Sequence, residues 1–162
     1  MATFPLSVHA SGRYFITAAG TPFYLYGEAP WSLIAELNLT DARQYLDDRQ
    51  AKGFNSLLVN VIEWNYTSHS PHWRNANGDL AFANVNNMDS PNDLYFDYAV
   101  TICNEAASRG MMLFLTPAYL GFEGANPVEG WYDTMVTNGA TKLRTYGQYL
   151  GTKFASCNNI IW

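Results

Sequence analysis

The sequence carries little charge and no concentration of basic residues. Of its 162 residues only 14% are charged, and the net charge is −5, with nine Lys and Arg against fourteen Asp and Glu. Binding to nucleic acid or to an anionic membrane requires a basic surface, so we expect neither partner. No stretch approaches the roughly 18 apolar residues of a membrane span, and no signal peptide is recognisable at the start. A cytoplasmic location is expected, although the sequence also leaves the location open.

Cysteines and metal-binding patterns are scarce. Cys103 and Cys157 are isolated from each other and lack metal-ligand spacing. Their isolation favours two buried free thiols, with a disulfide as the alternative. His69 and His72 could share a metal on a helical turn, but no third ligand follows at a suitable spacing. There is also no glycine-rich phosphate loop, so neither a metal nor a cofactor is expected.

Hydrophobic and aromatic residues are abundant instead. They make up 48% and 15% of the chain, which contains five Trp and eleven Tyr. A chain of this length suits one domain with a substantial core. Aromatic rings of this number serve sugar-binding clefts, where they pack on the apolar faces of pyranose rings, and they equally serve an aromatic-rich core.

The organising stretch is an apolar run at residues 57–62, between Gly53 and Trp64. The run is rich in β-branched residues and too short for an independent helix, which predicts a strand buried on both faces of a parallel sheet. A basic residue, a glycine and a strand recur at residues 52–54 and 109–111, as expected for repeating β/α units. Further strands are predicted at residues 23–28, 111–116 and 159–162. Helices are predicted at residues 31–37, from a capping Thr40 to residue 52, from a capping Ser90 through an apolar stripe (Leu94, Tyr98, Ile102, Ala106) to residue 109, and at residues 141–154.

These elements predict an α/β fold with two parts. Residues 1–22 form a short N-terminal β-meander, and residues 23–162 form the first half of a (β/α)8 barrel, with about four parallel strands. A complete TIM-type barrel needs roughly 250 residues, so we expect an incomplete one. Long loops follow the strands, at residues 65–89 and after residue 117, and such loops build the active site in this fold.

Acidic and aromatic residues lie at or just past the predicted strand ends. Glycoside hydrolysis requires two carboxyl groups that face each other, and Glu28, Glu63 and Glu123 are positioned for such a role or for contacts with solvent and backbone amides. Trp31 and Trp64 follow two of these acids, which suits a sugar platform or packing at the barrel rim. We expect Glu28, Asn60 and Glu63 to cluster at one end of the sheet with a tryptophan beside them. The candidate substrate-binding residues are Glu28, Trp31, Asn60, Glu63, Trp64 and Tyr119.

Several blocks of the sequence, in order, resemble the apiosidase-like glycoside hydrolases, a family long described only as a domain of unknown function. The resemblance runs from about residue 6 to residue 162, and it implies a (β/α)8 barrel that cleaves glycosidic bonds in plant-type or other complex polysaccharides. The family commonly has Asp where this chain has Glu28. The matching blocks are Leu25-Tyr-Gly-Glu-Ala-Pro-Trp31, Tyr45-Leu-Asp-Asp-Arg-Gln-Ala-Lys-Gly-Phe-Asn55, Pro91-Asn-Asp-Leu-Tyr-Phe96 and Tyr146-Gly-Gln-Tyr-Leu-Gly151, followed by Asn159-Ile-Ile-Trp162.

The resemblance also implies that catalysis needs residues beyond Trp162. The family's general acid is an aspartate in a Gly-Gly-Asp run directly after the strand that ends here, and its partner carboxylate lies on a later strand. We therefore assign no catalytic residue and expect this N-terminal half to be inactive alone. The alternative is a carbohydrate-binding or structural module without catalysis. In either case open sheet edges predict self-association, with a homodimer as its form.

Overall fold

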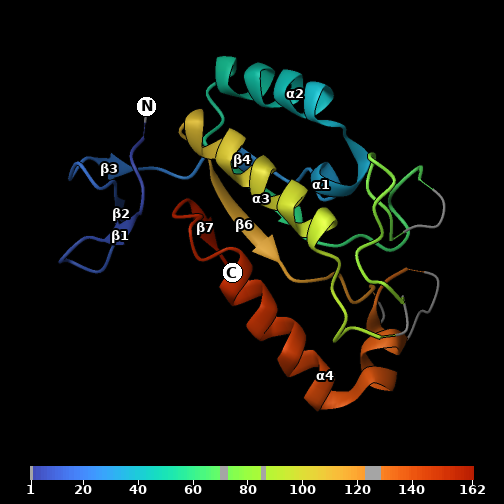
Figure 1. Cartoon of the computed structure of the whole chain (residues 1–162). Helices are drawn as coiled ribbons and strands as arrows, with labels where there is room; N and C mark the ends of the chain where they lie inside the picture. Colours follow the sequence, from blue (N-terminus) through green and yellow to red (C-terminus); the bar gives the residue numbers. More distant parts are fainter. Residues whose placement is uncertain (1, 70–72, 85–86, 123–128) are drawn as a thin grey trace.

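The computed structural model describes residues 2–69, 73–84, 87–122 and 129–162. Two sheets are present (Figure 1). The N-terminal segment forms the predicted meander, an antiparallel sheet in the order β1-β2-β3. Its strands are β1 (Ser7–Val8), β2 (Phe15–Ile16) and β3 (Pro22–Phe23).

The rest of the chain is a parallel sheet with helical connections, as the repeating β/α pattern predicts. The four strands are hydrogen-bonded in chain order, and Glu28 of the first is level with Leu57 of the second. This arrangement is half of a TIM-type barrel. The strands are β4 (Gly27–Glu28), β5 (Ser56–Asn60), β6 (Met112–Thr116) and β7 (Ile160–Ile161).

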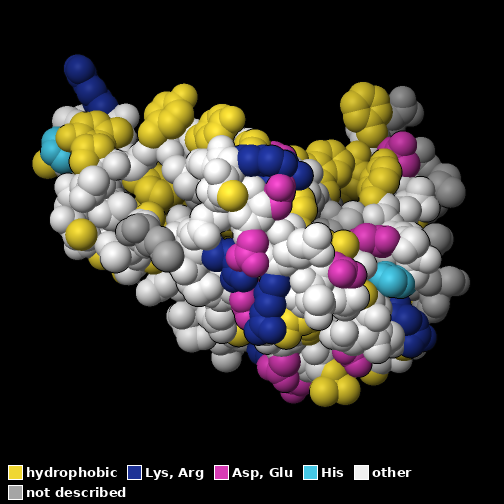
Figure 2. Space-filling model, turned by 90° about the horizontal axis from the view of Figure 1, so that it is seen from above, with side chains coloured by type: hydrophobic (Ala, Val, Ile, Leu, Met, Phe, Trp, Pro, Cys, Tyr) yellow, Lys and Arg dark blue, Asp and Glu magenta, His cyan; other side chains and the backbone are white. Residues whose placement is uncertain are grey.

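Helices cover one face of the parallel sheet, with α3 between α2 and α4 (Figure 1). Seen from the α2 side, acidic and basic side chains cover the middle of the surface, and hydrophobic side chains gather along the upper edge (Figure 2). No helix among the described residues is long and apolar enough to cross a membrane. The helices are α1 (Leu33–Glu36), α2 (Leu39–Ala51), α3 (Asp93–Ser108) and α4 (Tyr132–Lys153).

The core lies between the sheet and these helices. Leu57 and Val59 of β5 are fully buried, whereas Leu58 between them is 36% exposed. Because side chains alternate along a strand, Leu58 points to the opposite face, which none of the described helices covers. The prediction of burial on both faces is therefore wrong for Leu58.

Asparagines cap two helices that were predicted to begin with hydroxyl residues. The Asn38 side chain accepts hydrogen bonds from the backbone N–H groups of Thr40 and Asp41 at 2.9 and 3.0 Å, so Asn38 rather than Thr40 caps α2. Asn92 likewise caps α3, and the Ser90 hydroxyl instead donates to the carbonyl of Asn87. Asparagine and serine are equally good caps, so a pattern alone does not choose between neighbouring candidates.

Two other boundaries and one buried position differ from the sequence prediction. Phe23, predicted to open the first barrel strand, pairs within the meander as part of β3. Leu94, predicted to lie in the buried stripe of α3, is 65% exposed. The last helix begins at Tyr132 rather than at residue 141, with a break at Gly139, where φ is 71° and ψ is 171°.

Other local predictions are confirmed. Gly53 has φ of 83°, a left-handed conformation that ends α2 at little cost only for glycine. Gly110 follows α3 in the same left-handed conformation, with φ of 71°. Cys103 and Cys157 are buried free thiols. A hydrogen bond with Cys157, together with burial, raises the pKa of the Cys103 thiol.

Candidate functional site

Two polar side chains meet where neighbouring strands end. Asn60, the last residue of β5, is level with Thr116, the last residue of β6. The Thr116 hydroxyl donates to Asn60 Oδ1, and Asn60 Nδ2 donates to Glu63 Oε2 at 3.1 Å. These bonds fix the amide of Asn60, and they bring together Asn60 and Glu63 as the sequence predicts.

Glu63 is a buried carboxylate with a full set of partners. Its side chain is 0% exposed, and besides Asn60 it accepts the Ser32 hydroxyl at 3.0 Å and the backbone N–H of Trp64 at 3.0 Å. Burial of a charged group requires such partners. Burial and the charge of Glu63 raise the pKa of the neighbouring Tyr95, whose hydroxyl donates to the carbonyl of Val61 at 3.0 Å. Ser32 was not predicted, because nothing in the sequence relates it to a residue 31 positions later.

Three aromatic rings stand beside this polar pair. The ring centroid of Trp31 lies 5.3 Å from that of Tyr119 and 6.3 Å from that of Tyr66. Trp31 is 38% exposed and Tyr66 44% exposed, so the cluster presents ring surface to solvent. Burial and the neighbouring Tyr66 raise the pKa of Tyr119. Tyr66 was missed because its loop has no periodic pattern.

Trp31 and Tyr119, together with Asn60 and Thr116, border a hollow of about 360 Å³, whereas Tyr66 packs behind these two rings. This volume is at the lower end of the range for small-molecule sites. A hydrogen bond of 2.8 Å from the Asn60 backbone N–H to the Trp31 carbonyl ties the ring-bearing segment to β5. The hollow is lined by Trp31, Leu58, Asn60, Thr116, Ala118, Tyr119, Leu120 and Gly121.

Trp64, which was predicted as a second platform ring, is partly buried and packs against the core. Its ring centroid lies 4.9 Å from that of Trp131 and 5.5 Å from that of Trp73. Trp131, which the sequence placed in a loop, is fully buried. These ring contacts correspond to the packing alternative for Trp64, and its contact with a sugar stays a prediction.

Glu28 lies apart from the other predicted residues. It accepts a hydrogen bond from the Tyr45 hydroxyl and forms an ion pair of 3.0 Å with Arg49 Nε, both on α2. It is level with Leu57, three residues before Asn60, which corresponds to about 10 Å along the strand. The predicted cluster of Glu28, Asn60 and Glu63 is thus wrong in its first member. Burial and the bond to Glu28 raise the pKa of Tyr45.

The loop that carries Tyr66 is fastened to α1. The Glu36 carboxylate accepts the Ser68 backbone N–H at 2.7 Å and the Ser68 hydroxyl at 2.5 Å. His69 Nε2 donates to the Glu36 carbonyl at 3.0 Å. Burial alone would raise the pKa of Glu36, but the bonds from Ser68 outweigh it and lower that pKa.

The remaining predicted candidates are Glu123 and the pair His69 and His72. Glu123 and His72 lie outside the described residues. Within the described ranges, no group of three or more His, Cys, Asp or Glu side chains is placed to hold a metal ion.

One protein-family model matches nearly the whole chain. The family model for the apiosidase-like catalytic domain matches residues 9–162. No curated protein sequence matches the chain.

Similar solved structures are glycoside hydrolases. One described only as a glycoside hydrolase has a TM-score of 0.73 and 24% identity, over 100% of this chain and 35% of its own. A family 5 glycoside hydrolase from Bacteroides vulgatus ATCC 8482 gives 0.73 and 24%, over 97% of this chain and 31% of its own. An endo-1,4-beta-mannanase from Rhizomucor miehei gives 0.61 and 17%, over 91% and 44%. At these identities the likeness concerns the fold. The chain spans about a third of the first two structures.

Proposed function

Because the chain belongs to the apiosidase-like glycoside hydrolase family, we propose that it is the sugar-binding N-terminal part of a barrel that hydrolyses glycosidic bonds in plant-type or other complex polysaccharides. The observation that supports this proposal is the exposed ring cluster of Trp31, Tyr66 and Tyr119 beside the fixed amide of Asn60. Ring faces pack on the C–H faces of a pyranose, and an oriented amide selects its hydroxyl positions.

Each residue has a defined part in this proposal. Trp31 and Tyr119 provide the surface on which a sugar ring rests. Asn60 Nδ2 has two hydrogens, and after donating one to Glu63 it retains the other for a sugar hydroxyl. Glu63 is fully buried, so it acts through Asn60 as a positioning residue.

Glu28 and Glu63, the two described carboxylates that were predicted for such a role, both have other partners. Hydrolysis requires two carboxyl groups facing each other across the scissile bond, about 5–5.5 Å apart for retention and about 6.5–9.5 Å apart for inversion. Glu63 is buried among its three donors, and Glu28 is paired with Arg49. We therefore propose that the general acid and its partner come from residues that follow Trp162 in a complete barrel, and that this chain alone does not hydrolyse glycosides.

Two measurements test the proposal. Titration with β-1,4-manno-oligosaccharides, chosen because a mannanase shares the fold, should give binding that Trp31→Ala weakens about three- to tenfold. The control Trp162→Ala alters a tryptophan that is 52% exposed and packs on Phe154, and it should leave binding unchanged. Aryl glycosides should not be cleaved by the purified chain. Cleavage abolished by Glu28→Gln or Glu63→Gln would contradict the proposal and assign catalysis to those residues.

A binding module without catalysis is the second candidate, and the complete burial of Glu63 favours it. The gene sequence after the codon for Trp162 separates the two. A Gly-Gly-Asp run there supports the hydrolase, and its absence supports the binding module.

A further inference from the structure

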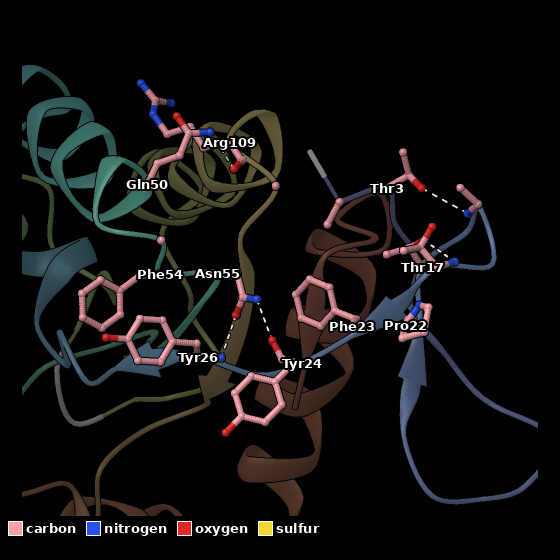
Figure 3. Close-up of a pocket in the computed structure, with 15 residues that line it drawn as sticks. Thr3, Thr17, Pro22, Phe23, Tyr24, Tyr26, Gln50, Phe54, Asn55 and Arg109 are labelled. Carbon is pink, nitrogen blue, oxygen red and sulfur yellow. Dashed lines mark hydrogen bonds between the residues drawn. The ribbon is translucent and has the colours of Figure 1, made fainter.

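A second and larger hollow lies at the other end of the parallel sheet. Its volume is about 720 Å³, and it separates the N-terminal meander from the turns that precede β5 and β6. Figure 3 shows Gln50, Phe54 and Arg109 on one side of it and Thr3 and Thr17 on the other. We refer to it as the meander groove.

The meander groove is distinct from the site at the strand ends. Asn55, which lines the groove, directly precedes β5, and Asn60 ends that strand. Five residues of extended chain correspond to about 16 Å. A ligand in the groove therefore does not occupy the hollow beside Trp31.

Two tyrosines present their rings at the groove. Tyr24 is 82% exposed and Tyr26 is 50% exposed, so each ring is accessible to a ligand. The Tyr26 ring stacks on Phe54 with centroids 4.7 Å apart and planes at 7°. The Asn55 side chain holds the segment in place, donating to the Tyr24 carbonyl at 2.6 Å and accepting the Tyr26 N–H at 2.8 Å (Figure 3). The backbone that carries both rings is therefore fixed before any ligand arrives.

Hydroxyl and amide groups complete the lining. The hydroxyls of Thr3 and Thr17 accept the backbone N–H groups of Ala19 and Thr21, each at 3.2 Å. An oxygen that accepts such a bond still has its own hydrogen to donate. Gln50 Nε2 donates to the Arg109 carbonyl at 2.8 Å, which orients Gln50 and leaves its Oε1 as an acceptor. The groove thus offers both donors and acceptors.

The meander groove is close to electrically neutral. Arg109 is the charged residue among those that line it. The positive charge of its guanidinium is balanced by Asp47 at 2.6 Å and Glu105 at 2.8 Å. Free ring faces, hydroxyls and amides without net charge match a ligand with C–H faces and many hydroxyl groups. We propose that the meander groove is a second carbohydrate site, which binds a neutral oligosaccharide segment on Tyr24 and Tyr26.

Affinity electrophoresis of the whole chain tests this proposal. Native gels would contain galactomannan, xylan or mixed-linkage β-glucan as neutral probes and polygalacturonate as the anionic one. In the background of Trp31→Ala, which impairs the first site, we expect at least one neutral probe to retard the chain. Tyr24→Ala should weaken this remaining retardation about three- to tenfold, and Tyr24→Phe, which keeps the ring, should preserve it. Tyr24 is largely exposed, so its removal should leave folding intact.

The matched control is Tyr132→Ala, which removes another exposed tyrosine that lies outside the groove, at the start of α4. It should leave retardation unchanged. Three outcomes would overturn the proposal. In the first, Tyr24→Ala is retarded as strongly as its Trp31→Ala background. In the others, polygalacturonate alone retards the chain, or no neutral probe does. The Trp31→Ala background separates this result from the proposed function, because retardation that depends on Trp31 alone supports the first site and excludes the second.

Discussion

At the scale of single residues, the site depends on the hydrogen bond that Asn60 donates to Glu63. Asn60 is 5% exposed and faces the hollow, whereas Glu63 is 0% exposed and holds the Asn60 amide in place. Such a division between a contacting and a supporting residue keeps the contacting group in one orientation.

Glu63→Gln should lower the free energy of unfolding by about 1–3 kcal/mol. Both carboxylate oxygens of Glu63 accept hydrogen bonds, and the NH2 group that replaces one of them cannot accept, so a buried donor loses its partner. The donors are Ser32, Asn60 and the Trp64 N–H. Urea denaturation measures the loss. Asp48→Asn is the control, since Asp48 is in an exposed ion pair with Lys52, and such pairs contribute about 0–1 kcal/mol. Equal effects of the two substitutions would argue against the supporting role of Glu63.

Gly27 is required by the close approach of β4 and β5. A Cβ atom at Gly27 would lie 2.1 Å from the Ser56 carbonyl oxygen, so Gly27→Ala must push the two strands apart. We expect a loss of at least about 1–3 kcal/mol in the free energy of unfolding. Gly147→Ala, in α4 with nothing within 4 Å of the added atom, should instead stabilise by about 0.5–1 kcal/mol. A neutral Gly27→Ala would show that β4 is not held against β5.

The sequence could predict Asn60 and Glu63 because both follow directly from the apolar run of β5. It could not predict Ser32 and Tyr66, because their roles arise from contacts with residues distant in the chain. Glu28 was misplaced for a related reason. Its strand has two residues, too few for the alternation of side chains to show which way the carboxylate points.

At the scale of elements, the connection between α1 and the following loop sets the position of Tyr66. Glu36 ends α1, and its two bonds to Ser68 fasten the loop two residues beyond Tyr66. The ring cluster beside the hollow therefore depends on a carboxylate that does not itself line it.

Acid should release this loop. The pKa of Glu36 is lowered in the folded chain from its ordinary value of 4.5, so its contribution is present above that value and is lost as the pH falls through the lower folded pKa. Hydrogen exchange of the Ser68 amide, corrected for its intrinsic rate, should show protection near neutral pH that disappears in acid. Glu36→Gln lacks this titration and should show little change with pH. Protection that falls identically in both chains would assign the effect to another group.

Helix and strand order could be read from the sequence because each helix–glycine–strand repeat is a local pattern. Cap positions and the start of α4 could not. Asn38 competes with Thr40 as a cap, and the first turns of α4 precede the break at Gly139, where the sequence has no regular apolar period. Tertiary packing around Trp131 determines that segment instead.

At the scale of the whole molecule, the parallel sheet has β4 at one edge and β7 at the other. The helices cover one face, and on the other Leu58 is partly exposed. Edge strands with free backbone groups and an uncovered apolar face are both sites of association. A half barrel with these open edges is therefore predicted to self-associate in solution.

We expect the chain to form a homodimer through these edges and this face. Covering apolar surface contributes about 25 cal/mol per Å², so a few hundred Å² is comparable to the marginal stability of a domain, about 5–15 kcal/mol. Sedimentation at increasing concentration should show the dimer, and Leu58→Lys should shift it toward monomer by placing a charge on the uncovered face. Val136→Lys, at a residue of α4 that is 63% exposed, should leave the distribution unchanged. A sharp monomer at every concentration, with cooperative unfolding, would mean that four parallel strands and their helices are stable with both edges open, and the expected dimer would have to be abandoned.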